Sequence, residues 1–306
     1  MSAITATTSR THPAAAGWPV AAWMPLVVLP VVTRLLTASA PRWVQMWGLA
    51  ISIYGGLKGL TLGVSSEGRK ATALGQAGYL FLWSGMDADE FFRRASQTLQ
   101  TRWTEWSWSV GQIAVGAWMI VGVAPRLVGK YPLIAGWLTM FGVVSVLHFG
   151  VSHLLSLGWR AAGVNARHIM HKPLLATSLA DFWGRRWNLA FRDVAHRFVL
   201  KPLLPIVGCS WAMMAVFFVS GLVHDAVISL SAGGGWGWPT LYFLIQGAAM
   251  WFERSRAGRL LGLGRGFVGW LCAAAVVVGP VGMLFHRPFI ERVVLPMLFS
   301  ITGAIS

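Results

Sequence analysis

The chain has 306 residues, of which 56% are hydrophobic and 11% are charged. Soluble domains carry about 25% charged residues, so this composition excludes a water-soluble globular protein and predicts an integral membrane protein. The 25 Lys and Arg residues against 10 Asp and Glu residues indicate first a membrane topology signal and second a preference for anionic lipids or anionic substrates. No nucleic-acid partner is expected.

Apolar segments follow one another along the chain with short gaps. Because a membrane-spanning helix needs roughly 20 apolar residues, the sequence predicts an all-α, polytopic membrane helix bundle, one domain over residues 1–306. It would hold about eight transmembrane helices plus cytoplasmic interfacial helices. The predicted spans are 18–37, 43–63, 106–125, 132–157, 209–231, 239–252, 266–285 and 289–305. Cys209 and Cys272 lie in apolar spans, which predicts buried free thiols.

Basic residues are divided unevenly between the two sets of loops. Residues 64–104, 158–208 and 253–265 hold 17 Lys and Arg residues, whereas the opposite loops hold five. Because cytoplasmic loops carry the excess of Lys and Arg, we expect both termini and the 158–208 loop in the cytoplasm. The membrane would be of the bacterial inner-membrane type.

Two of the cytoplasmic stretches are predicted to form helices at the membrane surface. Residues 71–100 mix apolar groups with the charged run "DADEFFRR". Over residues 181–201 the bulky side chains fall on one face at helical spacing, and Ser178 stands three residues before Asp181, as in an N-terminal cap. The apolar face of this second helix comprises Trp183, Trp187, Phe191, Val194, Phe198 and Val199.

Ionisable residues inside predicted spans are costly and therefore candidates for function. Lys58 lies close enough to a span end for its amine to reach the interface. His148 and His153 are five residues apart, so they lie on different faces of a helix, which favours a structural or substrate-lining role over a metal site. His168 and His171, in a basic loop, are expected to be solvated or to face phosphate.

His224 stands near the middle of the fifth apolar segment, in "FFVSGLVHDAVISL". Ser220 and Gly221 lie one turn earlier, where their small side chains leave space for a ligand or for another helix. An imidazole there suits general base catalysis, because its ordinary pKa lies near working pH; a histidine hydrogen-bonded between helices is the alternative. Asp225 would either orient this imidazole or pair with a neighbouring cation, and the second is favoured because adjacent helical positions point about 100° apart.

Two stretches together resemble a known family. "TSLADFWGRRWN" at 177–188 is similar to the signature of the wax synthase-like branch of the membrane-bound O-acyltransferases, and "FFVSGLVHD" at 217–225 resembles its histidine motif, which usually continues with Glu rather than Asp. Weaker similarities are "LIQGAAMWFE" at 244–253 and "HRPFIERVVLPML" at 286–298.

The resemblance implies transfer of an acyl group from acyl-CoA, as co-substrate, to a hydroxyl of a lipophilic acceptor, either a long-chain alcohol or a terpenoid- or sterol-like alcohol. The family's histidine falls on His224 and its asparagine on Asn188, which would act as general base and as oxyanion partner. No permanently bound cofactor and no metal are implied.

The same resemblance points to a substrate-binding set around the catalytic pair. It comprises Arg185, Arg186, Trp183, Trp187, Asp181, Ser220 and Gly221. The two arginines would hold CoA phosphates, with Lys172, Arg192 and Arg197 as outer candidates; binding of anionic lipid headgroups is the alternative. The two tryptophans would be interface anchors or the wall of a tunnel.

Two further functions fit a small apolar bundle with buried histidines. A proton-coupled transporter would relay protons through His148, His153 and His224, although the inverted repeats common in such folds are not visible in the sequence. A non-catalytic scaffold that binds membrane lipids is the other possibility.

Overall fold

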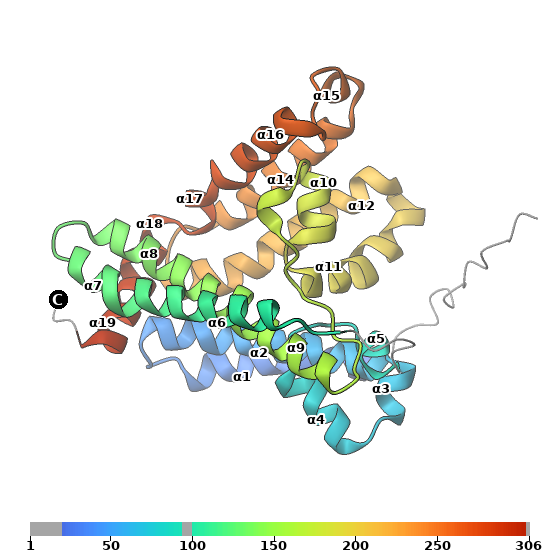
Figure 1. Ribbon diagram of the computed structural model, residues 1–306, viewed down its shortest axis with the longest axis horizontal. Coiled ribbons are helices and arrows are strands. Elements are labelled where there is room, and N and C mark those ends of the chain that lie inside the picture. Colours follow the sequence, from blue (N-terminus) through green and yellow to red (C-terminus); the bar gives the residue numbers. More distant parts are fainter. Residues whose placement is uncertain (1–19, 94–99, 304–306) are drawn as a thin grey trace, which may run out of the picture.

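The protein is described here by a computed structural model that covers residues 20–93 and 100–303. Within those two ranges every regular element is helical and no strand occurs (Figure 1). Parts of three predicted segments lie outside the described residues. They are 18–19 of the predicted span 18–37, 304–305 of the predicted span 289–305, and 94–99 of the predicted surface helix over 71–100.

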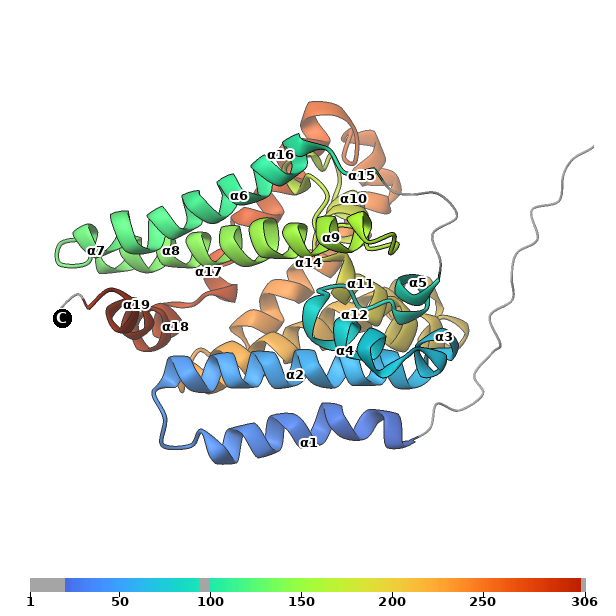
Figure 2. The same cartoon turned by 60° about the horizontal axis from the view of Figure 1, so that its bottom comes forward.

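The first two helices form an antiparallel pair along one side of the molecule (Figure 2). They are α1 (Val20–Leu36) and α2 (Arg42–Val64). Their close approach depends on Gly56, because a Cβ there would lie 2.6 Å from the Leu26 Cα. The predicted surface helix over 71–100 is divided: after α3 (Ser66–Lys70) come α4 (Ala73–Leu82) and α5 (Ala88–Phe92), with Thr72 and Asp87 as their N-caps.

A second antiparallel pair lies on the side opposite α1 in Figure 2. Its outgoing rod is α6 (Trp103–Ala117), η1 (Trp118–Val123) and α7 (Ala124–Leu127), and its returning rod is α8 (Pro132–Val144), η2 (Ser145–Val151) and α9 (Ser152–Ala161). A Cβ on Gly116 would lie 2.6 Å from the Gly142 carbonyl oxygen. These two glycines therefore bring the rods into backbone contact.

The chain then passes through short helical segments, which are η3 (Pro173–Leu175), α10 (Leu179–Asp181), η4 (Phe182–Arg186), α11 (Leu189–Ala195) and η5 (His196–Leu200). The long helix α12 (Lys201–His224) follows and carries the histidine motif, and it continues into η6 (Asp225–Ser229) and α13 (Leu230–Ala232). The remaining elements are α14 (Trp238–Arg254), α15 (Arg256–Leu260), α16 (Gly266–Val278), α17 (Val281–Leu284), α18 (Arg287–Phe289), η7 (Ile290–Val294) and α19 (Leu295–Thr302).

Four helices in the described ranges are long and apolar enough to cross a membrane, so the predicted count of about eight is not confirmed. They are Trp103–Leu127, Pro132–Ala161, Leu189–Ala232 and Gly266–Leu284. The helix Val20–Leu36 is apolar but has 17 residues, and α14 has 17 residues as well. These helices are shorter than the roughly 20 residues that a typical span needs.

The prediction of one continuous helix over 181–201 is wrong. The helical turns end at Arg186, Trp187 is extended with ψ 125°, and Asn188 has a left-handed backbone with φ 43°. Asn is one of the residues that tolerate this conformation. A new helix begins at Leu189 and runs on through η5 into the fifth predicted span.

Three other sequence expectations are corrected by burial. Lys58 does not reach the interface: it is fully buried, its Nζ donates to the Gly85 carbonyl at 2.7 Å, and it lies 3.3 Å from the Tyr79 ring centroid. Cys209 and Cys272 are both free, but Cys209 is exposed and Cys272 is half-buried.

The largest buried apolar cluster lies where α12 and α14 meet the C-terminal elements. It includes Met213 and Phe217 from α12, Phe243 and Met250 from α14, and Val293 from η7. The segment with the "FWGRRWN" motif packs on α14 at this cluster (Figure 1). The packing therefore places the two motifs beside each other.

Candidate active site

The motif segment is held in place at its first turn. The Ser178 hydroxyl accepts from the Asp181 main-chain N–H at 2.9 Å, as predicted for an N-cap. The Glu253 carboxylate, at the end of α14, accepts from the Leu179 N–H at 2.8 Å and from the Ala180 N–H at 3.5 Å. The weakly similar stretch 244–253 thus positions the motif through a half-buried charge-assisted contact.

The turn at Asn188 is supported from the other side by residues 169–171. The His171 N–H donates to the Arg186 carbonyl at 2.8 Å, and the Leu189 N–H donates to the Ile169 carbonyl at 2.9 Å. The Asn188 Oδ1 lies 3.5 Å from the Phe191 N–H that it accepts from. With Oδ1 turned to the backbone, the Asn188 Nδ2 keeps both of its donors, for which the described residues provide no acceptor.

Six rings form a continuous row from the motif to the histidine. Neighbouring ring centroids are separated by 4.5, 5.7, 5.0, 5.5 and 6.3 Å in the order His224, Phe243, Trp183, Phe182, Trp187 and His148. We call these six residues the aromatic row. Trp183 and Trp187 are half-buried within it.

The orientation of His224 fixes which of its nitrogens is available. Its Nδ1 lies 2.7 Å from the Ser220 main-chain oxygen. A carbonyl only accepts, so Nδ1 carries the hydrogen and the neutral imidazole presents an unprotonated Nε2. The described residues supply no hydrogen-bond partner for that Nε2. The next turn, η6, is π-helical, with the Leu230 N–H bonded to the Asp225 carbonyl, a distortion that is frequent at functional sites.

The two small residues before His224 have separate roles. The Ser220 hydroxyl donates to the Val216 carbonyl at 2.8 Å, within its own helix. Gly221 is buried against α14, because a Cβ there would lie 2.6 Å from the Thr240 Cα. Of the two roles predicted for this pair, close helix approach is therefore the one that Gly221 fills.

Asp225 pairs with no cation in the part of the chain that the structure describes, which corrects the sequence prediction. Its Oδ1 accepts from the Gly237 N–H at 3.0 Å and from the Ser229 hydroxyl at 2.7 Å, while its Oδ2 accepts from the Thr240 N–H and hydroxyl. Gly237 and Thr240 are at the start of α14, where main-chain N–H groups lack helical partners. Asp225 therefore caps α14 and fixes it against α12.

The weakly similar stretch 286–298 begins with a buried histidine in the same network. The His286 Nδ1 accepts from the Phe289 N–H at 3.2 Å, so its Nε2 carries the hydrogen and donates to the Ser229 hydroxyl at 3.2 Å. Burial lowers the pKa of His286, which keeps this ring neutral. Both of its nitrogens are used, so it supports Asp225 through Ser229.

The two arginines of the motif differ in availability. Arg186 forms an ion pair with Asp181, with Nε 2.5 Å from Oδ2, and donates to the Lys172 carbonyl at 3.1 Å. Arg185 is exposed and forms no ion pair within the described residues. Asp181 thus neutralises Arg186 and shapes the motif, whereas Arg185 is the motif cation that faces solvent.

The outer basic residues are partly engaged as well. Arg192 pairs with the adjacent Asp193 at 2.7 Å, and Arg197 lies 3.4 Å from Asp89 of α5. Lys172 is exposed in a left-handed conformation with φ 47°.

Three of the remaining histidines, His148, His153 and His168, are half-buried. His148 stacks on Trp187, and its Nδ1 is buried with no hydrogen-bond partner in the described chain. The His153 Nε2 contacts the Met170 carbonyl at 3.1 Å. His168 is 20% exposed and its Nε2 accepts from the Arg160 guanidinium at 3.1 Å, so the prediction of a solvated side chain is wrong.

No group of three or more His, Cys, Asp or Glu side chains in the described ranges is placed to hold a metal ion. His171 is exposed.

Four residues with a part in this site were not singled out from the sequence. Phe243 packs on His224, and Gln246 accepts from the Trp183 Nε1 at 3.3 Å. Glu253 caps the motif and Ser229 connects Asp225 to His286. The three α14 residues follow a helical spacing along one face, a signal that is visible in the sequence only when the partner of that face is known.

One family match covers the segment that contains both motifs. Residues 166–246 match the membrane bound O-acyl transferase family. A probable long-chain-alcohol O-fatty-acyltransferase of Arabidopsis thaliana is 38% identical over 96 residues, which are 28% of each chain. A long-chain-alcohol O-fatty-acyltransferase of Simmondsia chinensis is 32% identical over 123 residues, or 34% of this chain and 35% of the relative.

An acyl-CoA–sterol O-acyltransferase of Arabidopsis thaliana is 36% identical over 85 residues, which are 25% of each chain. The chain covers between 25% and 42% of the length of the relatives it matches. The family match covers 166–246, a segment that holds both Asn188 and His224. This match and the similarity to the long-chain-alcohol O-fatty-acyltransferases confirm that the chain resembles the wax synthase-like branch of the membrane-bound O-acyltransferases.

Proposed function

We propose that the protein is a membrane O-acyltransferase that moves an acyl group from acyl-CoA to the hydroxyl of a lipophilic alcohol, with His224 as the general base. The observation that carries this proposal is the contact between the His224 Nδ1 and the Ser220 carbonyl at 2.7 Å. It leaves Nε2 as an unprotonated nitrogen inside an apolar helix pair, where a lipid-soluble alcohol can reach it.

The chemistry follows from that nitrogen. An alcohol is a poor nucleophile at neutral pH, so the His224 Nε2 takes the hydroxyl proton as the alcohol oxygen attacks the thioester carbon. When the tetrahedral intermediate collapses, the C–S bond breaks and the protonated imidazole returns its proton to the leaving sulfur. The products are an ester and CoA with a free thiol. The aromatic row excludes water, which would otherwise hydrolyse the thioester.

Asn188 is proposed to stabilise the negative charge that develops on the thioester oxygen. Its Oδ1 is turned to the Phe191 N–H, so its Nδ2 donors are the ones that a substrate oxygen would meet. The described residues show no direct contact between Asn188 and His224; the aromatic row runs from His224 to Trp187, the residue before Asn188. Substrate would therefore lie along this row, between the two polar side chains.

Acyl-CoA is proposed to approach from the side of the motif. Arg185 is the exposed, unpaired cation there, and Lys172 is exposed close to it through its carbonyl contact with Arg186. The division of basic residues supports the proposal that this loop and both termini lie in the cytoplasm, where CoA is available. A membrane of the bacterial inner-membrane type remains part of this proposal.

The acceptor is proposed to be a lipophilic alcohol, either long-chain or sterol-like. Relatives named for long-chain alcohols and for sterols are both similar to part of this chain. The aromatic row offers such an acceptor apolar contact, with His224 as the polar group at its end.

A direct test is to incubate the purified protein with isotope-labelled acyl-CoAs of several chain lengths and a membrane lipid extract, and to identify esters by mass spectrometry. We expect a labelled ester with the wild type and none with His224→Ala at matched folded protein. Hydrolysis without ester formation, or equal ester formation by both proteins, would overturn the proposal.

A further inference from the structure

Helices α12 and α14 pack closely at two places. Beside His224, an added Cβ on Gly221 would lie 2.6 Å from the Thr240 Cα, and further along the pair an added Cβ on Gly247 would lie 2.7 Å from the Met214 Sδ. Beyond Met214, α12 is interrupted at Gly208, whose φ of 74° is not helical. The α12 residues next to this break face the end of α14.

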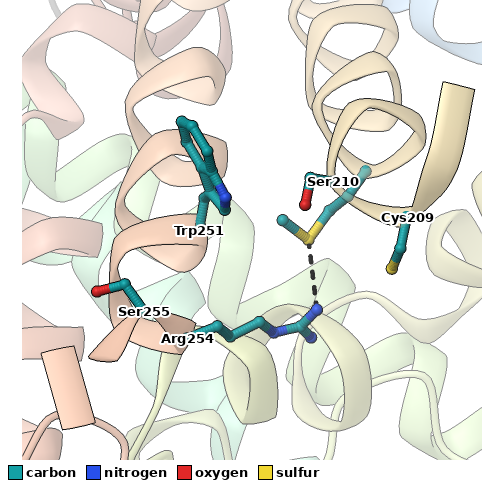
Figure 3. Close-up of a pocket in the computed structure, with 6 residues that line it drawn as sticks. Cys209, Ser210, Trp251, Arg254 and Ser255 are labelled. Carbon is teal, nitrogen blue, oxygen red and sulfur yellow. Dashed lines mark hydrogen bonds between the residues drawn. The ribbon is translucent and has the colours of Figure 1, made fainter. Parts of the chain in front are cut away.

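A cleft of about 210 Å³ occupies the opening between them (Figure 3). Its walls are Cys209, Ser210 and Met213 from α12 and Trp251, Arg254 and Ser255 from the end of α14. In Figure 3 the Arg254 side chain extends from α14 towards α12, below Ser210, and Trp251 lies on the α14 side of the opening. The cleft thus combines one cation, hydroxyl groups and an indole.

The charge of Arg254 is not neutralised by the protein. Its NH1 lies 3.8 Å from the Met213 Sδ, and a thioether is a weak acceptor. Within the described residues Arg254 forms no ion pair, and its side chain is exposed. Its guanidinium therefore keeps donors for an anionic ligand in the cleft, such as a phosphate.

The surroundings of the cleft are also positive. Arg256 and Arg259 follow on α15, and the Arg259 NH1 donates to the Arg254 carbonyl at 2.7 Å. The nearest carboxylate in sequence, Glu253, is engaged with the Leu179 and Ala180 N–H groups on the opposite side. A negative ligand is favoured by this field.

The cleft opens among apolar side chains that are exposed in the structure and that a bilayer would cover. Trp251 is 59% exposed, Trp211 69% and Ile206 76%, and the helix Leu189–Ala232 is one of the candidate spans. Trp beside Arg at the end of an apolar helix is typical of the headgroup level of a membrane. A ligand that enters here comes from the lipid phase.

We propose that this cleft is a binding site for the headgroup of an anionic phospholipid. Its phosphate would lie on the Arg254 guanidinium, with the Ser210 hydroxyl as a further donor. The start of an acyl chain would lie against Met213 and Trp251. This site is separate from His224 and does not depend on the acyltransferase proposal.

Native mass spectrometry of the full-length protein, purified in detergent and supplied with phosphatidylglycerol or phosphatidylcholine, tests the proposal. We expect wild type to retain phosphatidylglycerol preferentially, and Arg254→Gln to retain about fivefold less, which is the effect of one Arg on an anionic lipid. Arg256→Gln is the matched control, because it removes one positive charge near the same end of α14 but outside the cleft. This variant should retain nearly as much phosphatidylglycerol as wild type.

A second variant keeps the test decisive if Arg254→Gln does not fold. Ser210→Trp fills the cleft without removing charge, and we expect it to lose phosphatidylglycerol as well. Equal loss in Arg254→Gln and Arg256→Gln would indicate diffuse surface charge and overturn the site. The proposal of an anionic lipid site would also be overturned if wild type retained phosphatidylcholine as well as it retained phosphatidylglycerol, or if free CoA displaced phosphatidylglycerol.

Discussion

The His224 Nδ1 lies 2.7 Å from the main-chain oxygen of Ser220, and this contact determines which imidazole nitrogen can act as a base. Because the acceptor is a main-chain atom, the orientation does not require the Ser220 side chain, whose hydroxyl is bonded to the Val216 carbonyl. The proposed base is therefore set by the local backbone of α12.

The first prediction separates the side chains of these two residues. His224→Ala should lower ester formation by at least roughly 100-fold, since loss of a general base costs about 10²–10⁴-fold in rate. Ser220→Ala should keep ester formation within about twofold, because the carbonyl remains. Initial rates with labelled acyl-CoA at matched folded protein are the measurement. A large loss in Ser220→Ala would mean that its hydroxyl contacts substrate.

The second prediction concerns the contact of α12 with α14. Gly221→Ala should destabilise the protein by about 1–3 kcal/mol, the usual cost of overpacking, since its Cβ would meet main-chain atoms of Thr240. Gly111→Ala in α6 is the control, because an added Cβ there meets nothing within 4 Å. Thermal unfolding in detergent compares the two variants. An unchanged midpoint for Gly221→Ala would contradict the packing of this helix pair.

The third prediction follows from the capping role of Asp225. Asp225→Ala should lower the unfolding midpoint, with a cost of about 2 kcal/mol for the lost cap and hydrogen bonds. Asp225→Asn keeps one acceptor oxygen and should cost less. If Asp225 instead acted only on His224, ester formation would fall in both variants while the unfolding midpoint stayed the same.

The motif segment illustrates what the sequence could and could not predict. The Ser178 cap was predicted from residue spacing and is present in the structure, whereas the stretch 177–188 was singled out by its resemblance to a known family. The left-handed turn at Asn188 was not predicted, because the apolar spacing on both sides is helical. The turn depends on hydrogen bonds to residues 169–171, and nothing in a local pattern indicates those partners.

Buried charges show the same limit. Lys58 was expected to reach the interface, yet its amine bonds the Gly85 carbonyl, 27 residues along the chain. Asp225 was expected to pair with a cation, yet its partners are at the start of α14. A local pattern reports that a charge is buried, whereas its partner depends on how distant helices pack.

The fourth prediction distinguishes Arg185 from Arg186. Arg185→Gln should raise the KM for acyl-CoA about two- to fivefold, the scale of one exposed ion pair, and weaken its dependence on salt. Arg186→Gln should instead lower the unfolding midpoint, because it leaves the Asp181 carboxylate without its partner. Steady-state kinetics at two salt concentrations and thermal unfolding separate the two effects. If Arg186→Gln instead raised the KM for acyl-CoA and left the unfolding midpoint unchanged, Arg186 would be the residue that binds CoA, in place of its ion pair with Asp181.

The fifth prediction is a pH dependence of stability from His168. Burial, followed by the nearby His153 and Arg160, lowers the pKa of His168 to about 4, whereas an unfolded histidine has a pKa of about 6.5. The unfolded state binds the proton first, so the stability from neutral His168 is complete above pH 6.5 and is lost as pH falls towards 4.

The unfolding midpoint of wild type should therefore fall between pH 7 and pH 5, and His168→Gln should show a smaller fall, because glutamine does not titrate. His171→Gln is the matched control, since that histidine is exposed and its replacement should leave the pH dependence unchanged. Thermal unfolding at the two pH values gives the change of the unfolding midpoint with pH for wild type and for both variants. Parallel slopes for wild type and His168→Gln would mean that other buried groups, and not His168, take up the proton on unfolding.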